Sequence, residues 1–369
     1  MRLCHHAVLA LFLAGAAAAL PAQSLQTALA QNPAPILTPI PAPMQMQPPA
    51  PPLTVDRDPV RSPEGESPLP RNQSPLLPKV TGQGEGYVLR TNVDEVVLNC
   101  TVLHGNELVP GLKKEDFQVV EDGVQQKIIS FQHTDLPVSF ALVVDNSGSM
   151  ASKRSAVNEA ALDLIEASNP QDEAFVVNFS DEAFLDQDFT SNVDKLRRAL
   201  GQIESRGGTA LYDAVAASAD KLVADGKHSK QVLILITDGE DNDSTIDLNQ
   251  AVGRVQQLSG PVIYSIGLLF GDEDMSRSEV KQARKALEML STETGGVAFF
   301  PKNLGQVDQI AAEVARDIRN QYMVGYHSTK PTSEPGFRHV VVTAEARGVG
   351  KLTVRTRTGY FPAARVTRP

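Results

Sequence analysis

The sequence predicts an α/β fold with a doubly wound, mostly parallel sheet flanked by helices, together with a small β-sandwich-like domain. Apolar runs alternate with amphipathic runs between residues 137 and 320, a pattern typical of a parallel sheet covered on both faces. Segments rich in β-branched residues lie before and after this region. With 369 residues, 41% of them apolar, the chain is long and apolar enough to bury such a core.

The α/β region, residues 137–320, holds short apolar runs of strand length and longer runs with helical spacing. The short runs predict strands at residues 139–144, 175–179, 232–236 and 262–269. The longer runs repeat apolar residues every three or four positions and predict helices at 154–168, 211–225 and 307–321. Because a helical crossover separates successive strands, we expect neighbouring strands to be parallel.

Two strand-rich segments flank this region, at residues 82–136 and 321–369. The first holds runs 94–103 and 115–133, and the pair Asp122-Gly123 inside the second run predicts a type I′ hairpin turn. The second segment holds the runs 321–327, 338–346 and 351–361. Each set is too small for a stable sheet alone. We therefore expect both to join into one β-sandwich-like domain, from which the α/β region emerges as an insertion.

The first 30 residues have the layout of a secretory signal peptide. Arg2 precedes an apolar run at 7–20, and small residues follow, with cleavage expected after Ala22 or Ala30. The run is too short and too rich in alanine for a typical membrane span, so membrane anchoring is expected only if the signal stays uncleaved. The sequence thus predicts a secreted protein, or one of the periplasm or cell envelope.

Residues 31–81 hold 15 of the 25 prolines and are predicted to be a disordered, extended linker. A ligand for a proline-reading domain is the alternative.

The net charge of −10 and the lack of a Lys/Arg cluster argue against a nucleic-acid partner. Cys4 falls in the predicted signal, so Cys100 has no partner for a disulfide and is expected to be a buried apolar residue.

Three loops of the α/β region carry oxygen-bearing side chains at predicted boundaries between strands and helices. They are "DNSGS" at 145–149, "GGT" at 207–209 and "TDGED" at 237–241. In an open parallel sheet, ligands bind at the carboxyl ends of the strands, where such loops converge. Hard divalent cations such as Mg²⁺ or Mn²⁺ select oxygen ligands. The candidate metal ligands are Asp145, Ser147, Ser149, Thr209 and Asp238.

Each loop also has a simpler interpretation. The residues of "DNSGS" could cap the following helix, since Ser and Asp accept hydrogen bonds from free amide groups there. "GGT" could be a tight turn and "TDGED" a solvated turn. The conjunction of three oxygen-bearing loops at one edge of a sheet favours the cation site.

These residues resemble the metal-ion-dependent adhesion site of the von Willebrand factor A family, which has the order D-x-S-x-S, Thr, Asp. All five positions match, and the resemblance covers about residues 137–320. It implies that the three hydroxyls contact the cation directly or nearly so, and that Asp145 and Asp238 bind directly or through water. It further implies an open coordination position for an Asp or Glu of a partner protein. Asp241 and Asp243 could form a second cation site, or simply a solvated acidic loop.

A second resemblance covers the flanking segments. "VPGLKKEDFQVVEDG" at 109–123 and "TGYFP" at 358–362 are similar to stretches of a bacterial group of secreted proteins related to the same family. That similarity implies little about function.

The enzyme classes that sequence motifs can identify are not supported. The chain lacks a G-x-S-x-G elbow and a Walker loop, and its seven histidines do not pair at metal-ligand spacing. A phosphatase of the dehalogenase type would need a carboxylate where Ser147 stands. The prediction is a non-enzymatic, exported adhesion module that binds a partner's acidic residue through the cation. The alternatives are an envelope scaffold whose metal site only stabilises the fold and, less favoured, a metal-assisted hydrolase.

Overall fold

The computed structural model describes residues 54–55, 95–166, 169–201, 207–239, 241–258, 260–270 and 276–362. The predicted signal peptide, residues 1–30, lies outside these residues. The predicted linker, residues 31–81, does so too, except for Thr54 and Val55. Among the described residues, no helix combines the length and the apolar character needed to cross a bilayer.

The α/β region is built on a seven-stranded mixed sheet with the order β1-β9-β8-β7-β10-β11-β12. Neighbouring strands are parallel except for the antiparallel pair β8 and β9. The four predicted strands correspond to β7, β8, β10 and β11 and lie side by side. The strand bounds are β1 (Thr54–Val55), β7 (Val138–Asp145), β8 (Glu173–Phe179), β9 (Ala183–Thr190), β10 (Lys230–Thr237), β11 (Val262–Gly267) and β12 (Ala298–Phe299).

Strand β9 is not among the predicted strands, and it makes the sheet mixed. The chain turns back after β8, where the Ser180 amide donates to the Glu182 carbonyl over 3.0 Å. The side chains of β9 are mostly half-buried, so its sequence lacks the continuous apolar run that marks the central strands. On its other edge β9 pairs with β1, with Thr54 opposite Phe184.

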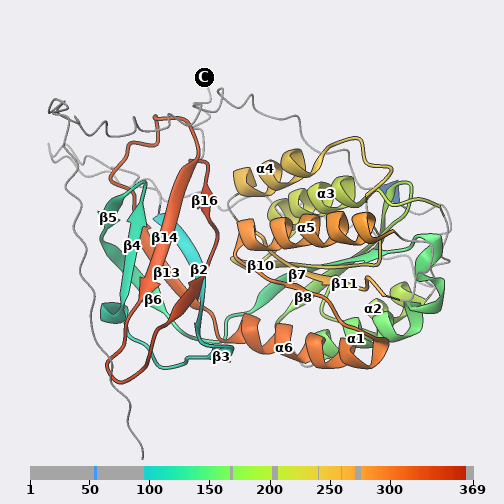
Figure 1. Ribbon diagram of the computed structural model, residues 1–369, viewed down its shortest axis with the longest axis horizontal. Helices are drawn as coiled ribbons and strands as arrows, with labels where there is room; N and C mark the ends of the chain where they lie inside the picture. The colour runs from blue at the N-terminus through green and yellow to red at the C-terminus, as the bar shows by residue number, and fades with distance from the viewer. Residues whose placement is uncertain are drawn as a thin grey trace, which may run out of the picture. The chain divides into compact units, whose positions relative to one another are not determined.

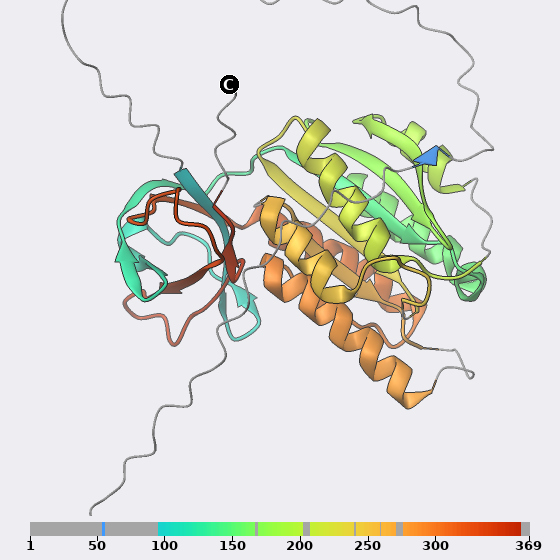
Figure 2. The same cartoon turned by 90° about the horizontal axis from the view of Figure 1, so that it is seen from above.

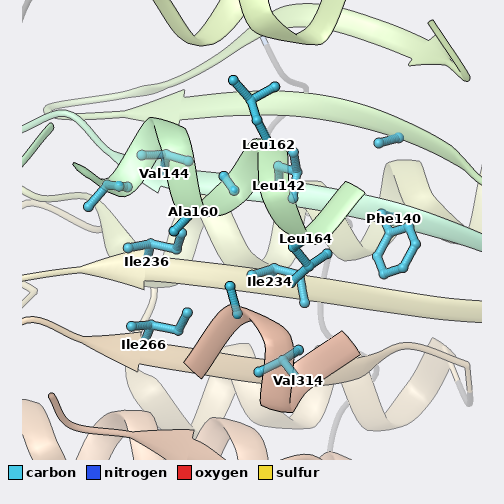
Figure 3. Packing of buried hydrophobic residues seen from close by; sticks show 14 of the residues in the cluster. Phe140, Leu142, Val144, Ala160, Leu162, Leu164, Ile234, Ile236, Ile266 and Val314 are labelled. Carbon is cyan, nitrogen blue, oxygen red and sulfur yellow. The ribbon is translucent and has the colours of Figure 1, made fainter. Parts of the chain in front are cut away.

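Helices cover both faces of this sheet (Figure 1). Phe140, Leu142 and Val144 of β7 pack in one core with α1 (Arg154–Glu166), α2 (Val193–Gly201) and α6 (Val307–Arg319). Figure 3 shows these three side chains with residues of β10, β11, α1 and α6. The alternate residues Ala141 and Val143 pack in a second core with α3 (Leu211–Asp225), α4 (Leu248–Leu258) and α5 (Arg277–Thr294). These last three helices lie side by side along their face (Figure 2). Strand β7 is therefore apolar on both faces because both are covered.

The flanking segments form two antiparallel sheets. One has the order β15-β2-β13-β6, with β3 paired to β2, and the other has the order β16-β14-β4-β5. Strand β13, which follows the α/β region, lies between β2 and β6, which precede it. The bounds are β2 (Glu95–His104), β3 (Glu107–Leu108), β4 (Phe117–Glu121), β5 (Val124–Gln126), β6 (Ile128–Gln132), β13 (Tyr322–His327), β14 (Arg338–Ala344), β15 (Thr353–Arg355) and β16 (Gly359–Tyr360).

A single hydrophobic core draws on both antiparallel sheets, including Leu98 of β2, Val119 of β4 and Tyr322 of β13. The β4–β5 hairpin turns at Asp122 and Gly123, which have φ values of 45° and 82°. Positive φ at both positions is what a type I′ turn requires, so the hairpin prediction is confirmed. Cys100 is a free, fully buried thiol in this core, as predicted.

A buried carboxylate links the strands of the two flanking segments. Glu121 at the end of β4 is 1% exposed and accepts hydrogen bonds from Tyr326 (2.7 Å), Tyr360 (2.9 Å) and Ser328. Arg338 of β14 lies 3.6 Å from the same carboxylate. Glu121 belongs to the "VVEDG" stretch and Tyr360 to the "TGYFP" stretch. The hydrogen bond from Tyr360 to Glu121 therefore brings these two stretches together.

Candidate metal centre

The sheet brings two acidic strand ends together. Strands β7 and β10 are adjacent and parallel, with Val144 opposite Ile236, so Asp145 and Asp238 follow neighbouring strands at the same edge. Both carboxylates are buried, at 0% and 1% exposure. The apolar runs before them account for this burial, because these strands are covered on both faces up to their last residues.

Asp145 is held by donors from its own loop and from β10. Its Oδ1 accepts a hydrogen bond from the Ser147 amide at 2.8 Å, and its Oδ2 accepts one from the Thr237 hydroxyl. Burial raises the pKa of Asp145 to about 6, and the nearby charge of Asp238 acts in the same direction. The cost of that burial falls when a positive charge lies beside the carboxylate.

The two serine hydroxyls connect the two acidic strand ends. Ser147 Oγ lies 3.1 Å from Ser149 Oγ, and Ser149 Oγ donates to Asp238 Oδ1 at 2.8 Å. Ser147 precedes the short 3₁₀ helix η2 (Gly148–Ser152), but its side chain makes no capping hydrogen bond. The capping interpretation is therefore wrong for Ser147. Its hydroxyl lies beside the hydroxyl of Ser149 instead.

Thr209 lies in the loop before α3 and is 4% exposed. Its amide donates to Asn242 Oδ1 at 2.9 Å, which joins this loop to the one after β10. A Cβ atom added to Gly239 would lie 3.6 Å from Thr209 Oγ1, so the hydroxyl lies close to the residue after Asp238. The preceding Gly207 has φ of 78° and lies against the carboxylate of Asp181, which explains the need for glycine there.

Lys153 belongs to the same cluster, and sequence reasoning missed it. Its Nζ lies 2.6 Å from Asp238 Oδ2, and the two side chains are 7% and 0% exposed. Lysine is not a metal ligand in oxygen-donor sites, so no ligand pattern points to it. Its position after η2, eight residues beyond Asp145, becomes meaningful only when β7 and β10 are placed side by side.

The oxygens of Ser147, Ser149 and Asp238 have separations compatible with a hard divalent cation. Adjacent ligands of an octahedral Mg²⁺ ion, each 2.0–2.1 Å from the metal, lie about 3 Å from one another. The separations of 3.1 Å between Ser147 and Ser149 and of 2.8 Å between Ser149 and Asp238 match that spacing. The described part of the chain contains no group of three or more His, Cys, Asp or Glu residues suited to a metal, and the candidate set itself has only two carboxylates beside its hydroxyls.

The suggested second cation site around Asp241 and Asp243 receives no similar support. Asp241 Oδ1 accepts hydrogen bonds from the Ser244 hydroxyl and, at 3.2 Å, from the Tyr212 amide. The amide of Asp243 donates to the Thr209 carbonyl over 3.3 Å. These contacts tie the acidic loop to the start of α3, which is a structural role.

Comparison with known proteins finds a family whose model is similar to the central part of the chain. Residues 140–240 match the family described as "von Willebrand factor type A domain", and all five candidate ligands lie in that range. The match concerns this region and not the whole chain. An uncharacterized protein of Synechocystis sp. is 28% identical over 172 residues, which cover 45% of this chain and 40% of that protein. The chain therefore spans less than half the length of this curated relative.

Solved structures with detectable similarity include the von Willebrand factor type A protein of Catenulispora acidiphila. It has a TM-score of 0.42 and 15% identity, over 73% of this chain and 75% of the other. The vWF domain of the type V pili tip protein Mfa5 of Porphyromonas gingivalis has a TM-score of 0.41 and 13% identity, over 51% and 96%. Proximal thread matrix protein 1 of the mussel byssus, with a zinc-occupied MIDAS motif, has a TM-score of 0.43 and 19% identity, over 55% and 50%.

Proposed function

We propose that this chain is an exported, non-enzymatic interaction module that binds an Asp or Glu of a partner protein through a divalent cation, Mg²⁺ or Mn²⁺. The residues that would hold the cation are Asp145, Ser147, Ser149, Thr209 and Asp238. One observation carries the proposal: the contacts from Ser147 through Ser149 to Asp238 set oxygens of two adjacent strand ends at the spacing of metal ligands. Domains of the matched family are in general protein-interaction modules.

Charge explains why the partner should be acidic. The bound cation supplies a positive centre at the rim of the sheet, where the low dielectric strengthens its attraction for anions. Asp145 and Asp238 together offset a charge of +2, and a third carboxylate can still replace a water on the solvent side. The three hydroxyls add oxygen atoms without adding negative charge, so they leave that attraction in place.

The other segments of the chain have proposed roles in exporting and presenting this site. We propose that residues 1–30 direct export, that residues 31–81 act as a linker, and that residues 82–136 and 321–369 form a β-sandwich-like domain carrying the domain at 137–320. The shared core of the two antiparallel sheets and the contacts of Glu121 support the joint domain. No nucleic-acid partner is proposed, given the net charge of −10.

A second candidate function is an envelope scaffold whose metal site only stabilises the fold. The burial of Asp145 and Asp238 favours it, because a bound cation would offset the cost of burying two carboxylates. This candidate predicts that partner capture does not depend on a cation.

The test has two stages, on the purified protein. Isothermal titration with Mg²⁺ and Mn²⁺ should show one cation site, lost in Asp145→Ala and retained in the exposed control Asp194→Ala. Binding is then measured to paired peptides that differ only in a central Asp or Asn, with cation or with EDTA. We expect cation-dependent binding of the Asp peptides alone, and Thr209→Ala should weaken it more than it weakens cation binding.

Absence of cation binding at millimolar concentration would overturn the metal site. Cation binding combined with peptide binding that is absent, or that EDTA does not change, would leave the scaffold candidate.

A further inference from the structure

The rim of the α/β sheet contains a buried ammonium group beside one of the two acidic ligands. Lys153 Nζ lies 2.6 Å from Asp238 Oδ2, and the side chain of Asp238 is fully buried. The neighbouring Arg154 donates a hydrogen bond to Asn146 Oδ1. A buried ion pair of this kind is costly to break unless another charge replaces the one removed.

Both oxygens of Asp238 are engaged. Oδ1 accepts from the Ser149 hydroxyl, and Oδ2 accepts from Lys153. A divalent cation bound at this carboxylate would meet a positive charge within a few ångströms, and like charges that close repel strongly at a weakly hydrated site. Either the ammonium moves away or the cation binds less tightly.

An aromatic ring lies beside the ammonium on the side of the segment after β11. The ring of Phe270, in the segment after β11, has its centroid 5.7 Å from Lys153 Nζ. An aromatic face attracts an ammonium at that distance. Nζ lies at this distance from the ring while it contacts Asp238, so the ring can retain the ammonium once it leaves Asp238 Oδ2, and the flexible four-carbon stem allows that shift.

We infer that Lys153 is the built-in counter-ion of the metal site: it neutralises Asp238 when no cation is bound, and releases Asp238 Oδ2 when a cation binds. This inference rests on the proposed function, because it assumes that Asp238 takes part in cation binding. Lys153 is a positioning residue and not a ligand. It keeps the cation-free rim folded, and it weakens the affinity for the cation by competing for the same oxygen.

The first test compares Lys153→Met with the protein itself and with Lys195→Met, which removes an exposed lysine of α2. Methionine retains most of the stem and removes the charge. Titration calorimetry should show Mg²⁺ and Mn²⁺ binding to Lys153→Met at least about tenfold tighter than to the unaltered protein. Without cation, the melting temperature of Lys153→Met should be lower, and saturating cation should remove most of that difference.

The second test needs no variant and remains available if Lys153→Met fails to fold without cation. The unaltered protein is reductively methylated with and without Mg²⁺, and modification of Lys153 is measured by mass spectrometry relative to Lys195. Release from Asp238 should raise the modification of Lys153 several-fold when Mg²⁺ is present.

The outcomes separate this inference from the proposed function. If Lys153→Met binds cation with unchanged affinity and Mg²⁺ leaves the modification of Lys153 unchanged, the counter-ion role is wrong although the metal site stands. If only Lys153→Met binds cation, Lys153 does occupy the site and the proposed metal-dependent function fails. If neither protein binds cation, both proposals are overturned.

Discussion

Glu121 in the antiparallel sheets and Asp238 at the edge of the α/β sheet are both buried carboxylates beside a basic side chain, but their other partners differ. Glu121 accepts from Tyr326 and Tyr360, whose rings are part of the surrounding core, and from Ser328. Asp238 accepts from Ser149, a loop residue whose hydroxyl also lies beside Ser147. The comparison teaches that burial of a carboxylate does not by itself indicate a binding site. What matters is whether its partners are core donors or further oxygen ligands.

Removal of residues 328–369 should have the largest effect. It deletes β14, β15 and β16 and three of the partners of Glu121, so β2 loses its neighbour β15 and β4 loses its neighbour β14. We expect loss of hydrogen-exchange protection across residues 95–132. A chain that ends at residue 362 is the control and should keep its protection. Unchanged protection of 95–132 in the shorter chain would refute a joint domain of the two flanking segments.

Glu121→Ala should be the most damaging single substitution. It leaves the guanidinium of Arg338, whose side chain is 3% exposed, without its carboxylate, and it leaves two tyrosine hydroxyls without an acceptor. Breaking a buried pair in this way costs about 3–5 kcal/mol. Urea unfolding should show this loss, whereas the exposed control Glu115→Ala should change stability by less than about 0.5 kcal/mol. A loss below about 1 kcal/mol for Glu121→Ala would contradict the core-donor role.

Asp145→Asn should have the opposite effect on stability at the other carboxylate cluster. Burial raises the pKa of Asp145 to about 6, above its value in the unfolded chain, so protonation favours the folded state. Stability of the cation-free protein should therefore fall as pH rises from about 4 through about 6. At pH 8 in EDTA, Asp145→Asn should be more stable than the unaltered protein, by at most about 3 kcal/mol, and should no longer bind cation.

Melting temperatures in EDTA at pH 5 and pH 8 check this expectation. Asp163→Asn, at an exposed position of α1, is the matched control. If Asp145→Asn melted lower than the unaltered protein at pH 8, its hydrogen bonds to Ser147 and Thr237 would outweigh the cost of its buried charge.

The smallest effect concerns thiol reactivity. It compares the core of the antiparallel sheets with the edge of the α/β sheet. Cys100 is fully buried, and this burial raises its pKa to about 12. Iodoacetamide at pH 8 should therefore not modify it in the folded protein. A cysteine placed at the exposed position Ser149 should react readily. Peptide-resolved mass spectrometry measures both. Rapid modification of Cys100 before unfolding would show that the β core opens far more often than its packing implies.

The sequence by itself determined much of the α/β region. Continuous apolar runs predicted β7, β8, β10 and β11, because strands covered on both faces must be apolar on both faces. Asp145 and Asp238 could also be predicted to lie at one edge of the sheet, because neighbouring parallel strands end on the same side. The Asp122-Gly123 turn was predictable because its backbone requirement is local.

Tertiary structure decided the features that depend on contacts between distant segments. The half-buried strand β9 carries no distinctive pattern, and its antiparallel pairing with β8 made the sheet mixed. Tyr326 and Tyr360 meet Glu121 across more than 200 residues of sequence, as the separations of 205 and 239 show. Lys153 reached Asp238 in the same way, over 85 residues. Local spacing reports backbone geometry and periodic burial, whereas the partner of a buried charge depends on which strands become neighbours once the chain has folded.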